Sequence, residues 1–454
     1  MSTCQFRKVV PAGQLSTYQP FTLANYRKIP QVYQLSREER FAIDVVGRVL
    51  PFKTNNYVVE QLIDWDRVPD DPLFRLTFPC REMLEDHHFE RIAALVRGNA
   101  APKQITACAN EIRQELNPHT AGQLEHNRPM LNGRVLRGMQ HKYKETVLCF
   151  PGQGQTCHAY CTFCFRWPQF VGVEELRFAM QEADELVRYL TAHPEVTDVI
   201  FTGGDPLVMR TRVLAAYLRP LLAAELPHLR TIRIGTKTLS YWPDRYVGDR
   251  DADDLLVLFE EVVAAGKHLA IMAHFNVPEE MGPDLVRQAI SRIRATGAVI
   301  RTQSPLLRHI NDTPESWIRL WKEQVTAGCI PYYMFVVRDT GAHHYFSLPL
   351  HRAWRIFRTA YKQVSGIART VRGPSMSALP GKVQINGVSE VHGEKVFVLQ
   401  MLQGRNPDWV GRPFFAAYDE KASWLDELRP AFGAERFFFE DDAAYPQGNG
   451  LHAV

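Results

Sequence analysis

The sequence predicts an α/β protein whose centre is a partial barrel of six strand–helix units. From about residue 145 to residue 364, short apolar runs typical of strands alternate with longer segments of helical periodicity, and short connections join them. Strands that alternate with helices in this way lie parallel and are joined by right-handed crossovers. Because six units are too few to close an eight-stranded barrel, we expect an open (β/α)6 barrel.

The six units follow one another directly along the chain. Their strands are short and rich in β-branched or aromatic residues, and the second, Thr-Asp-Val-Ile-Phe-Thr, is typical of a buried strand. The predicted strand and helix pairs are 145–150 with 173–192, 197–202 with 211–224, 231–234 with 252–265, 268–274 with 282–295, 298–303 with 314–327, and 332–337 with 350–364.

Two regions flank the barrel, which we assign to residues 141–365. Residues 1–140 form a helical and irregular N-terminal region, in which Ser36 followed by helical spacing indicates a helix start. Residues 366–454 form a C-terminal extension that begins with a hairpin-like pair of apolar segments. Its aromatic tail, which includes Trp409, Phe414, Phe415 and Phe437, packs either on a partner surface or on the chain itself.

Composition places the chain among soluble globular proteins. It has 454 residues, of which 45% are hydrophobic and 23% charged, and its net charge of +3 gives no reason to expect nucleic acid or a membrane as partner. The N-terminus has no apolar signal-peptide core, and no apolar run approaches the ~18 residues of a membrane span. Of eight cysteines, three are clustered and five are scattered, which is not a secreted disulfide framework, so we expect a cytoplasmic protein.

Polar residues follow the predicted strands where each strand ends. They are Gly203-Gly204-Asp205, Gly235-Thr236, His274 and Asn276, Gln303, and Arg338. Ligands of parallel α/β proteins bind beyond the carboxyl ends of the strands, so we expect one site built from six loops. Taken singly, each has a simpler interpretation. A Gly-Gly pair often does no more than reverse the chain, a histidine is often structural, and an arginine is often a solvated charge.

The loop after the first strand carries Cys157, Cys161 and Cys164 at C-x3-C-x2-C spacing. Clustered thiolates bind soft metals, and three of them on a four-iron cluster leave one iron open to a small molecule. Zinc is the alternative, but zinc prefers four nitrogen or sulfur ligands, and this sequence has no second cysteine pair.

These motifs resemble the radical S-adenosylmethionine (SAM) superfamily and, more narrowly, the lysine 2,3-aminomutase family. The cysteine motif is specific to the superfamily, and the whole set is specific to the aminomutase branch. Besides the cysteine loop, the matching stretches between about residues 60 and 400 are 71–72, 140–143, 202–207, 233–236, 274–276, 303–308 with 311–312, 331–333 and 380–382.

The resemblance implies a radical SAM isomerase, an intramolecular aminotransferase with a [4Fe–4S] cluster, SAM and pyridoxal 5′-phosphate (PLP). In the family, the open iron chelates SAM, and one electron from the cluster yields a 5′-deoxyadenosyl radical. That radical removes a hydrogen from the β-carbon of an amino acid held as a PLP aldimine, and the amino group migrates from Cα to Cβ. The protein positions these groups, while the cofactors carry the chemistry.

The resemblance also implies roles for individual residues. Cys157, Cys161 and Cys164 match the cluster ligands, and Arg166 matches the arginine that grips the substrate carboxylate with its bidentate fork. Lys382 matches the catalytic lysine that binds PLP covalently. The residues that would contact SAM or face the same cavity are Gly203, Gly204, Asp205, Gly235, Thr236, His274, Asn276 and Gln303.

The PLP region departs from the family pattern. The two phosphate-gripping arginines of the family appear here as Lys142, next to Tyr143, and as Thr146, so one cation remains. The glycine-rich loop before the PLP lysine is here Ala-Leu-Pro-Gly, although glycine-rich backbone is what cradles phosphate. We expect PLP to bind, and the alternative that Lys382 is an ordinary turn lysine stays open.

The substrate pocket departs as well. Lysine-specific enzymes of the family hold the distal ammonium with two aspartates, whereas here the first slot is Arg338, or Asp339 if the alignment slips by one, and the second is near Ser375. An arginine would repel a lysine side chain and favour a carboxylate or a neutral acceptor. We therefore expect an acidic or polar amino acid, such as glutamate, rather than free lysine.

Two other functions stay open. A radical SAM enzyme on the same scaffold could act without PLP on a small molecule or a peptide. An iron–sulfur electron carrier is disfavoured, because a carrier needs neither Arg166 nor a six-loop cavity. The expected partners are a small-molecule amino acid and an electron donor such as flavodoxin or ferredoxin, and the family's habits suggest a homo-oligomer.

Overall fold

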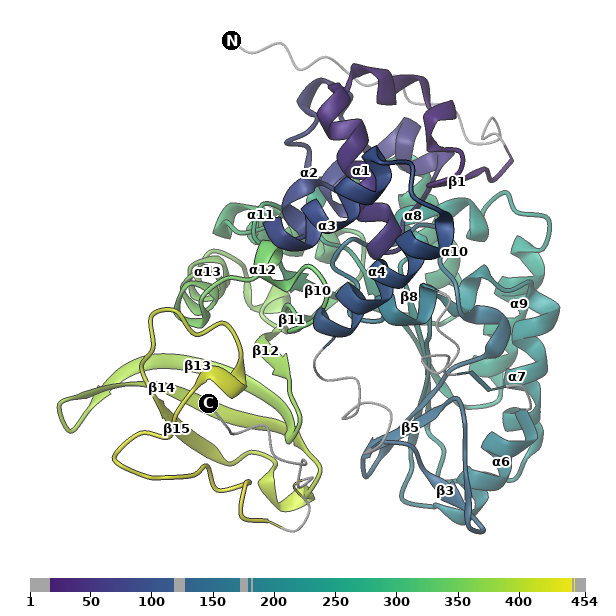
Figure 1. The fold of residues 1–454 in the computed structure, drawn as a ribbon. Helices are drawn as coiled ribbons and strands as arrows, with labels where there is room; N and C mark the ends of the chain where they lie inside the picture. Colours follow the sequence, from purple (N-terminus) through teal and green to yellow (C-terminus); the bar gives the residue numbers. More distant parts are fainter. Residues whose placement is uncertain (1–16, 118–126, 172–178, 181–182, 443–444, 446–454) are drawn as a thin grey trace.

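The computed structural model describes residues 17–117, 127–171, 179–180, 183–442 and 445 (Figure 1). Its centre is a sheet of eleven strands in the order β15-β14-β13-β12-β11-β10-β9-β8-β7-β6-β5. Neighbouring strands from β6 to β12 are parallel, whereas β5 and β13 to β15 pair antiparallel. These strands are β5 Met139–Tyr143, β6 Thr146–Cys149, β7 Asp198–Phe201, β8 Thr231–Thr236, β9 His268–His274, β10 Val299–Leu306, β11 Ile330–Val336, β12 Arg372–Ser377, β13 Gly381–Val391, β14 Glu394–Gly404 and β15 Pro413–Ala417.

Helices alternate with strands β6 to β11, as the sequence predicts, and β12 adds a seventh parallel strand that was not predicted. The long helices are α6 Ala183–Ala192, α7 Thr211–Ala223, α9 Ala252–Ala264, α10 Asp284–Ala295, α11 Pro314–Thr326 and α13 Leu350–Lys362, and two short ones, α8 Thr238–Tyr241 and α12 His343–Phe346, lie in the connections. The predicted helix 173–192 was too long. Met180 pairs with Pro151 in an isolated parallel bridge, and α6 begins only at Ala183. Residues 172–178 and 181–182 lie outside the described part of the chain.

Alternation along the strands gives the sheet two different faces. In β8, Ile232 and Ile234 are buried in the large core that also contains residues of the helices, so Arg233 and Gly235 face the other side. In β10, Ile300 belongs to the same core, and the alternating burial pattern turns Gln303 away from it. Gly235 and Gln303, two of the positions that the sequence singled out, therefore share the face that the helices do not cover.

The two ends of the sheet approach each other. Strand β5 contacts β14, although eight strands separate them in the sheet order. The Lys142 amine of β5 also donates a hydrogen bond to the carbonyl of Ala378, between β12 and β13. The uncovered face is therefore the concave one, and the described strands form no ladder that closes the sheet.

The N-terminal region packs over the carboxyl ends of the parallel strands. Its elements are β1 Pro20–Thr22, α1 Arg37–Val49, β2 Lys53–Asn55, α2 Pro72–Thr77, α3 Asp86–Arg97 and α4 Pro102–Glu115, followed by the small pair β3 Met130–Leu131 and β4 Arg134–Val135. Ser36 caps α1 as predicted, because its hydroxyl accepts from the Glu39 amide at 3.1 Å. The core of this region includes Ala159, Trp167 and Trp242, which belong to loops of the barrel.

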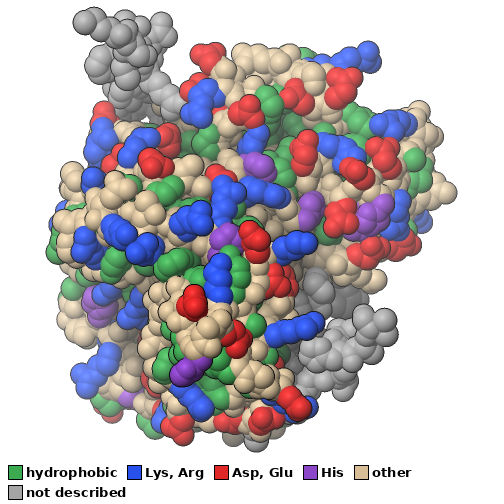
Figure 2. Space-filling model, turned by 90° about the vertical axis from the view of Figure 1, so that its left-hand side faces the viewer, with side chains coloured by type: hydrophobic (Ala, Val, Ile, Leu, Met, Phe, Trp, Pro, Cys, Tyr) green, Lys and Arg blue, Asp and Glu red, His purple; other side chains and the backbone are tan. Residues whose placement is uncertain are grey.

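The C-terminal extension has its own core. The predicted hairpin is β13 and β14, which β15 extends. Trp409, Phe414, Phe437 and Phe439 are buried in one cluster with residues of this hairpin, so the aromatic tail packs on the chain itself. None of the helices in the described ranges is long and apolar enough to cross a bilayer. On the face drawn in Figure 2, acidic and basic side chains are interspersed, which fits the small net charge.

Candidate active site

The loop with the three cysteines follows β6 and is held by the N-terminal region. The Lys53 amine donates to the carbonyl of Cys157 at 2.7 Å, and the Tyr160 amide donates to the carbonyl of Lys53 at 2.7 Å. The Thr162 amide donates to the carbonyl of Leu76 at 3.0 Å. Residues more than eighty positions earlier thus fix the loop backbone, which sequence spacing alone does not indicate.

The three thiols lie in surroundings that disfavour their charged form. Burial raises the pKa of all three thiols, that of Cys161 to about 12, and the pKa of Cys157 is raised further by the nearby Asp205. Without a cation, all three therefore prefer the neutral form at neutral pH. A bound metal reverses this preference, because it stabilises the thiolates directly.

The number of thiols bears on the choice between one metal ion and a larger cluster. Tetrahedral zinc prefers four nitrogen or sulfur ligands, and the loop offers three thiols. On a four-iron cluster, three thiolates leave one iron open to a small molecule. The donor set therefore favours the cluster.

The Gly-Gly-Asp loop after β7 is built into the cysteine loop. A Cβ on Gly204 would lie 2.3 Å from the carbonyl oxygen of Thr156, so only glycine allows this close backbone approach. The carboxylate of Asp205 is buried and accepts hydrogen bonds from the Thr236 hydroxyl, the Lys237 amide and the Thr238 hydroxyl, at 2.8 to 2.9 Å. Asp205 therefore joins the loops after β7 and β8, and its carboxylate is already satisfied.

A buried polar network lies beneath the cysteine loop. The Lys237 amine donates to Glu280 Oε1 at 2.6 Å and to Asn276 Oδ1 at 2.8 Å, and Asn276 Nδ2 donates to the Ser304 hydroxyl at 3.0 Å. The Cys161 thiol lies 3.8 Å from the hydroxyl of Tyr241, whose ring stacks under Lys237. The side chain of Asn276 is thus occupied by this network, which links the loops after β8 and β9 to strand β10.

His274 has a buried ring nitrogen that no other group in the described part of the chain contacts by a hydrogen bond. It ends β9, opposite Gln303 in the parallel register. Burial, with the nearby Lys237 charge, holds its pKa well below the usual range, so the ring is neutral. Its Nε2 atom is buried and has no hydrogen-bond partner, while the ring packs edge-on against Phe163 of the cysteine loop. A neutral imidazole with an unmet nitrogen is suited to contact a polar ligand.

Two arginines converge beside the cysteine loop. The guanidinium carbons of Arg166 and Arg338 lie 5.0 Å and 5.3 Å from the centre of the Phe165 ring. Burial lowers the pKa of Arg166 to about 10, and the charge of Arg338 contributes to the lowering. The Nε atom of Arg338 is buried without a hydrogen-bond partner. Two close cations of this kind favour an anionic ligand between or beside them.

Lys382 lies in β13 with its amine on the ring of Tyr333, 4.1 Å from the ring centre. Burial lowers its pKa to about 8, the Tyr332 hydroxyl opposes the lowering, and Arg233 and Arg372 add to it. About a tenth of this amine is therefore uncharged at pH 7, far more than for a lysine of ordinary pKa, and an uncharged amine is the nucleophilic form.

Two basic side chains donate hydrogen bonds to the loop before Lys382. Lys142 donates to the carbonyl of Ala378, while Arg405 donates through Nε to the carbonyl of Leu379 at 2.8 Å. Burial, together with the charges of Arg405, Arg338 and Lys382, holds the pKa of Lys142 well below its usual range. Burial also raises the pKa of the neighbouring Tyr143, which stays a neutral phenol.

Arg405 is the residue that the sequence interpretation missed. The pairing of Gly381 with Gly404 brings it beside the Lys382 turn, 263 positions after Lys142 on a different part of the sheet. The other proposed pocket residue, Ser375, is fully buried in β12, and its hydroxyl lies 3.5 Å from the carbonyl of Met334. The predicted residues thus form a cysteine end and a Lys382 end, and Arg338 lies near both.

Comparisons with known proteins agree with the motifs. No family model matches the chain. A protein of Aquifex aeolicus (strain VF5), provisionally named L-lysine 2,3-aminomutase, is 30% identical over 397 residues, which cover 87% of this chain and 92% of the relative. The L-lysine 2,3-aminomutase of Escherichia coli (strain K12) is 29% identical over 251 residues, which cover 54% of this chain and 69% of the relative.

Two solved structures align with part of the chain. A radical SAM methyltransferase from Sphaerobacter thermophilus aligns with a TM-score of 0.37 and 15% identity, over 64% of this chain and 94% of the other. Streptococcus suis SuiB bound to its precursor peptide SuiA aligns with a TM-score of 0.34 and 15% identity, over 57% of this chain and 50% of the other.

Proposed function

Since the chain belongs to the lysine 2,3-aminomutase family of radical SAM enzymes, we propose that it is an amino acid 2,3-aminomutase that uses PLP. The observation that carries the proposal is the environment of Lys382. Its amine has a lowered pKa, and the adjoining loop is gripped by Lys142 and Arg405. A nucleophilic amine with an arginine and a second amine close to it is suited to a phosphate-bearing carbonyl cofactor.

Family membership implies a [4Fe–4S] cluster and SAM, which Cys157, Cys161 and Cys164 would hold with one iron left for SAM. When bound, these groups supply the one-electron chemistry that removes a hydrogen atom from the substrate, and PLP supplies a carbonyl that takes up amino groups. We propose that SAM lies along Gly203, Gly204, Gly235, Thr236, His274 and Gln303. Because the side chains of Asp205 and Asn276 are occupied, they would act by holding these loops in position.

The chain's own residues bind and orient the substrate in this proposal. Arg166 binds the α-carboxylate, and the buried Lys382 amine holds or releases a proton at Nζ. Arg405 supplies a cation for the phosphate, and the Lys142 amine, whose pKa is lowered by burial, supplies N–H donors beside it. Only Lys142 stands at the family position. Tyr143 lies beside Lys142, whose amine is 5.5 Å from the phenol ring centre, and lines the same end of the site.

We infer that strands β6 to β11 form the partial barrel that is expected for this family. The contact between β5 and β14 supports a strongly curved sheet, and the helices lie on its convex side. We also propose the division into residues 1–140, 141–365 and 366–454, an electron donor of the flavodoxin or ferredoxin kind, and a homo-oligomer.

The substrate that we favour is an acidic or polar amino acid such as glutamate. Arg166 and Arg338 place two cations around one phenyl ring, which matches two carboxylates and repels the distal ammonium of lysine. A hydrogen bond to a charged group contributes about 1.5–3 kcal/mol, so Arg338→Gln should lower kcat/KM for the acidic substrate about 10- to 150-fold. An anaerobic screen of the standard amino acids that scores β-amino acid and 5′-deoxyadenosine together tests the assignment. Turnover of lysine with none of the acidic or polar amino acids would refute it.

The alternative is a PLP-independent radical SAM enzyme on the same scaffold. The glycine-poor loop favours it, as does the Lys142 amine, which already bonds to that loop. The visible absorbance of the anaerobically purified protein separates the two functions. A PLP band that is present in the wild type and absent from Lys382→Ala supports the aminomutase. SAM cleavage with no PLP uptake by the wild type would support the alternative.

A further inference from the structure

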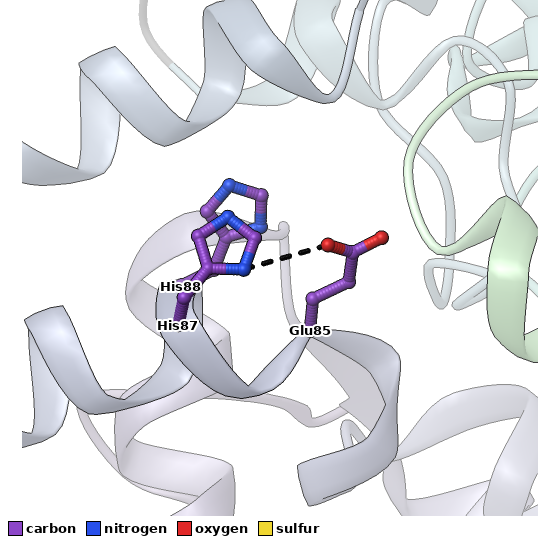
Figure 3. A group of neighbouring side chains, drawn as sticks. All are labelled: Glu85, His87 and His88. Atoms are coloured by element: carbon purple, nitrogen blue, oxygen red, sulfur yellow. Dashed lines mark ion pairs between the residues drawn. The ribbon is translucent and has the colours of Figure 1, made fainter.

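Three potential metal ligands meet at the start of α3, in the N-terminal region. Among the residues that the structure describes, Glu85, His87 and His88 are the one group of three histidine, cysteine or acidic side chains whose ligand atoms all lie within 4.8 Å of one another. Figure 3 shows the two imidazole rings one behind the other, with the Glu85 carboxylate facing them. The ring centres lie 3.8 Å apart.

His88 is already oriented as a metal ligand. Its side chain is only 5% exposed, and its Nε2 atom lies 2.7 Å from Glu115 Oε2 at the end of α4. A carboxylate so close keeps the ring proton on Nε2, so Nδ1 carries the free lone pair. That Nδ1 atom is buried and has no hydrogen-bond partner. An unmet buried acceptor is unfavourable, and a cation at this position would satisfy it.

The other two ligands face solvent and can admit an ion. His87 Nδ1 lies 3.4 Å from Glu85 Oε2, and both side chains are exposed. The partial positive charge at the N-terminus of α3 disfavours a cation here. The negative charges of the Glu85 and Glu115 carboxylates offset it. Arg91 pairs with the other oxygen of Glu115, at 3.2 Å, and so leaves Oε2 to His88.

We propose that Glu85, His87 and His88 bind one divalent transition-metal ion of the zinc class, with Glu115 as the carboxylate that orients His88. Two imidazole nitrogens and one carboxylate oxygen are the donor set that such ions prefer. A histidine ligand that gives its second N–H to a carboxylate is the usual arrangement in metal sites. Ligand bonds of about 2.0–2.2 Å bring the donor atoms to roughly 3.4 Å from one another, which small side-chain rotations achieve. The ion would join α3 to α4 and is separate from the cysteine site.

The test uses the full-length protein with its iron–sulfur cluster reconstituted, because empty cysteines would also bind zinc. Zinc and iron per chain are measured after equilibration with zinc and gel filtration. The wild type should hold one more zinc than His87→Ala or Glu85→Gln, with the same iron. Both replaced residues are exposed, so neither variant should disturb folding. His193→Ala is the control, since it removes another His–Glu pair, at 2.9 Å, and should keep the zinc.

A second measurement addresses the orienting carboxylate. Glu115→Gln should weaken zinc binding about 10- to 100-fold without removing a ligand, as replacements of such carboxylates do. Zinc should also raise the melting temperature of the wild type and leave that of His87→Ala unchanged. Equal zinc content in the wild type and His87→Ala, or equal affinity in the wild type and Glu115→Gln, would overturn the proposal.

Discussion

Replacing Glu280 by glutamine should destabilise the protein by about 3–5 kcal/mol, the cost of breaking a buried ion pair at one partner. The Glu280 side chain is 0% exposed and the Lys237 side chain 9%, with 2.6 Å between Nζ and Oε1. Glu280 also accepts from the Ser240 hydroxyl at 2.6 Å and from the Val277 amide at 3.0 Å. Glutamine leaves the Lys237 charge buried without a counter-ion. Its amide NH2 group would also face N–H and O–H groups that donate to Glu280.

The neighbouring residue provides a matched control. Glu279 pairs with Arg319 at 3.2 Å, but these side chains are 35% and 60% exposed, so Glu279→Gln should cost only about 0–1 kcal/mol. Urea unfolding followed by tryptophan fluorescence gives both values. The double variant Lys237→Met/Glu280→Gln should recover part of the loss, because it removes the orphaned charge. If the free energies of unfolding of Glu280→Gln and Glu279→Gln differ by less than about 1 kcal/mol, the buried Lys237–Glu280 pair does not stabilise the protein as expected.

Three further outcomes are expected. Since the pKa of Lys382 is lowered to about 8, its neutral fraction rises as pH increases through 8, so the rate of PLP uptake should rise with it; a rate that is flat across this pH contradicts the assignment. Arg405→Met should weaken PLP binding about 10- to 150-fold in a fluorescence titration, the effect of losing a charge-assisted hydrogen bond, whereas replacing the exposed Arg412 of the same β14–β15 connection by methionine should not. Gly204→Ala should cost about 1–3 kcal/mol in thermal unfolding, because its Cβ would meet Thr156 at 2.3 Å, whereas Gly235→Ala, with its nearest neighbour at 3.5 Å, should be tolerated.

The alternation of strands and helices could be predicted because it depends on residues that are close together in the sequence. The buried strand at 198–201 and the cap at Ser36 depend on residues next to one another in the sequence. The helix predicted at 173–192 failed at Met180, whose bridge to Pro151 is a contact between distant residues. Helical spacing cannot reveal such a contact, since tertiary pairing overrides local preference.

The candidate site divides in the same way. The cysteine spacing is local, so the cluster ligands could be proposed at once. The internal role of Asp205, the support from Lys53 and the position of Arg405 all depend on partners far away in the chain. One of these was accessible: the turn at 392–393 fixes the register of the β13–β14 hairpin, and counting back from it brings Arg405 beside Gly381.

The dependence of the cysteine loop on the N-terminal region sets an order for biosynthesis. The carbonyls of Lys53 and Leu76 accept hydrogen bonds from amides of the cysteine loop, and both residues leave the ribosome before the cysteines do. Arg405 follows Cys164 by about 240 residues, roughly 10–50 s later at 5–20 residues per second. The growing chain can therefore hold its cysteine loop well before the residues around Lys382 exist. Cluster insertion and PLP uptake would then be separate events, and the second would wait for the last strands of the sheet.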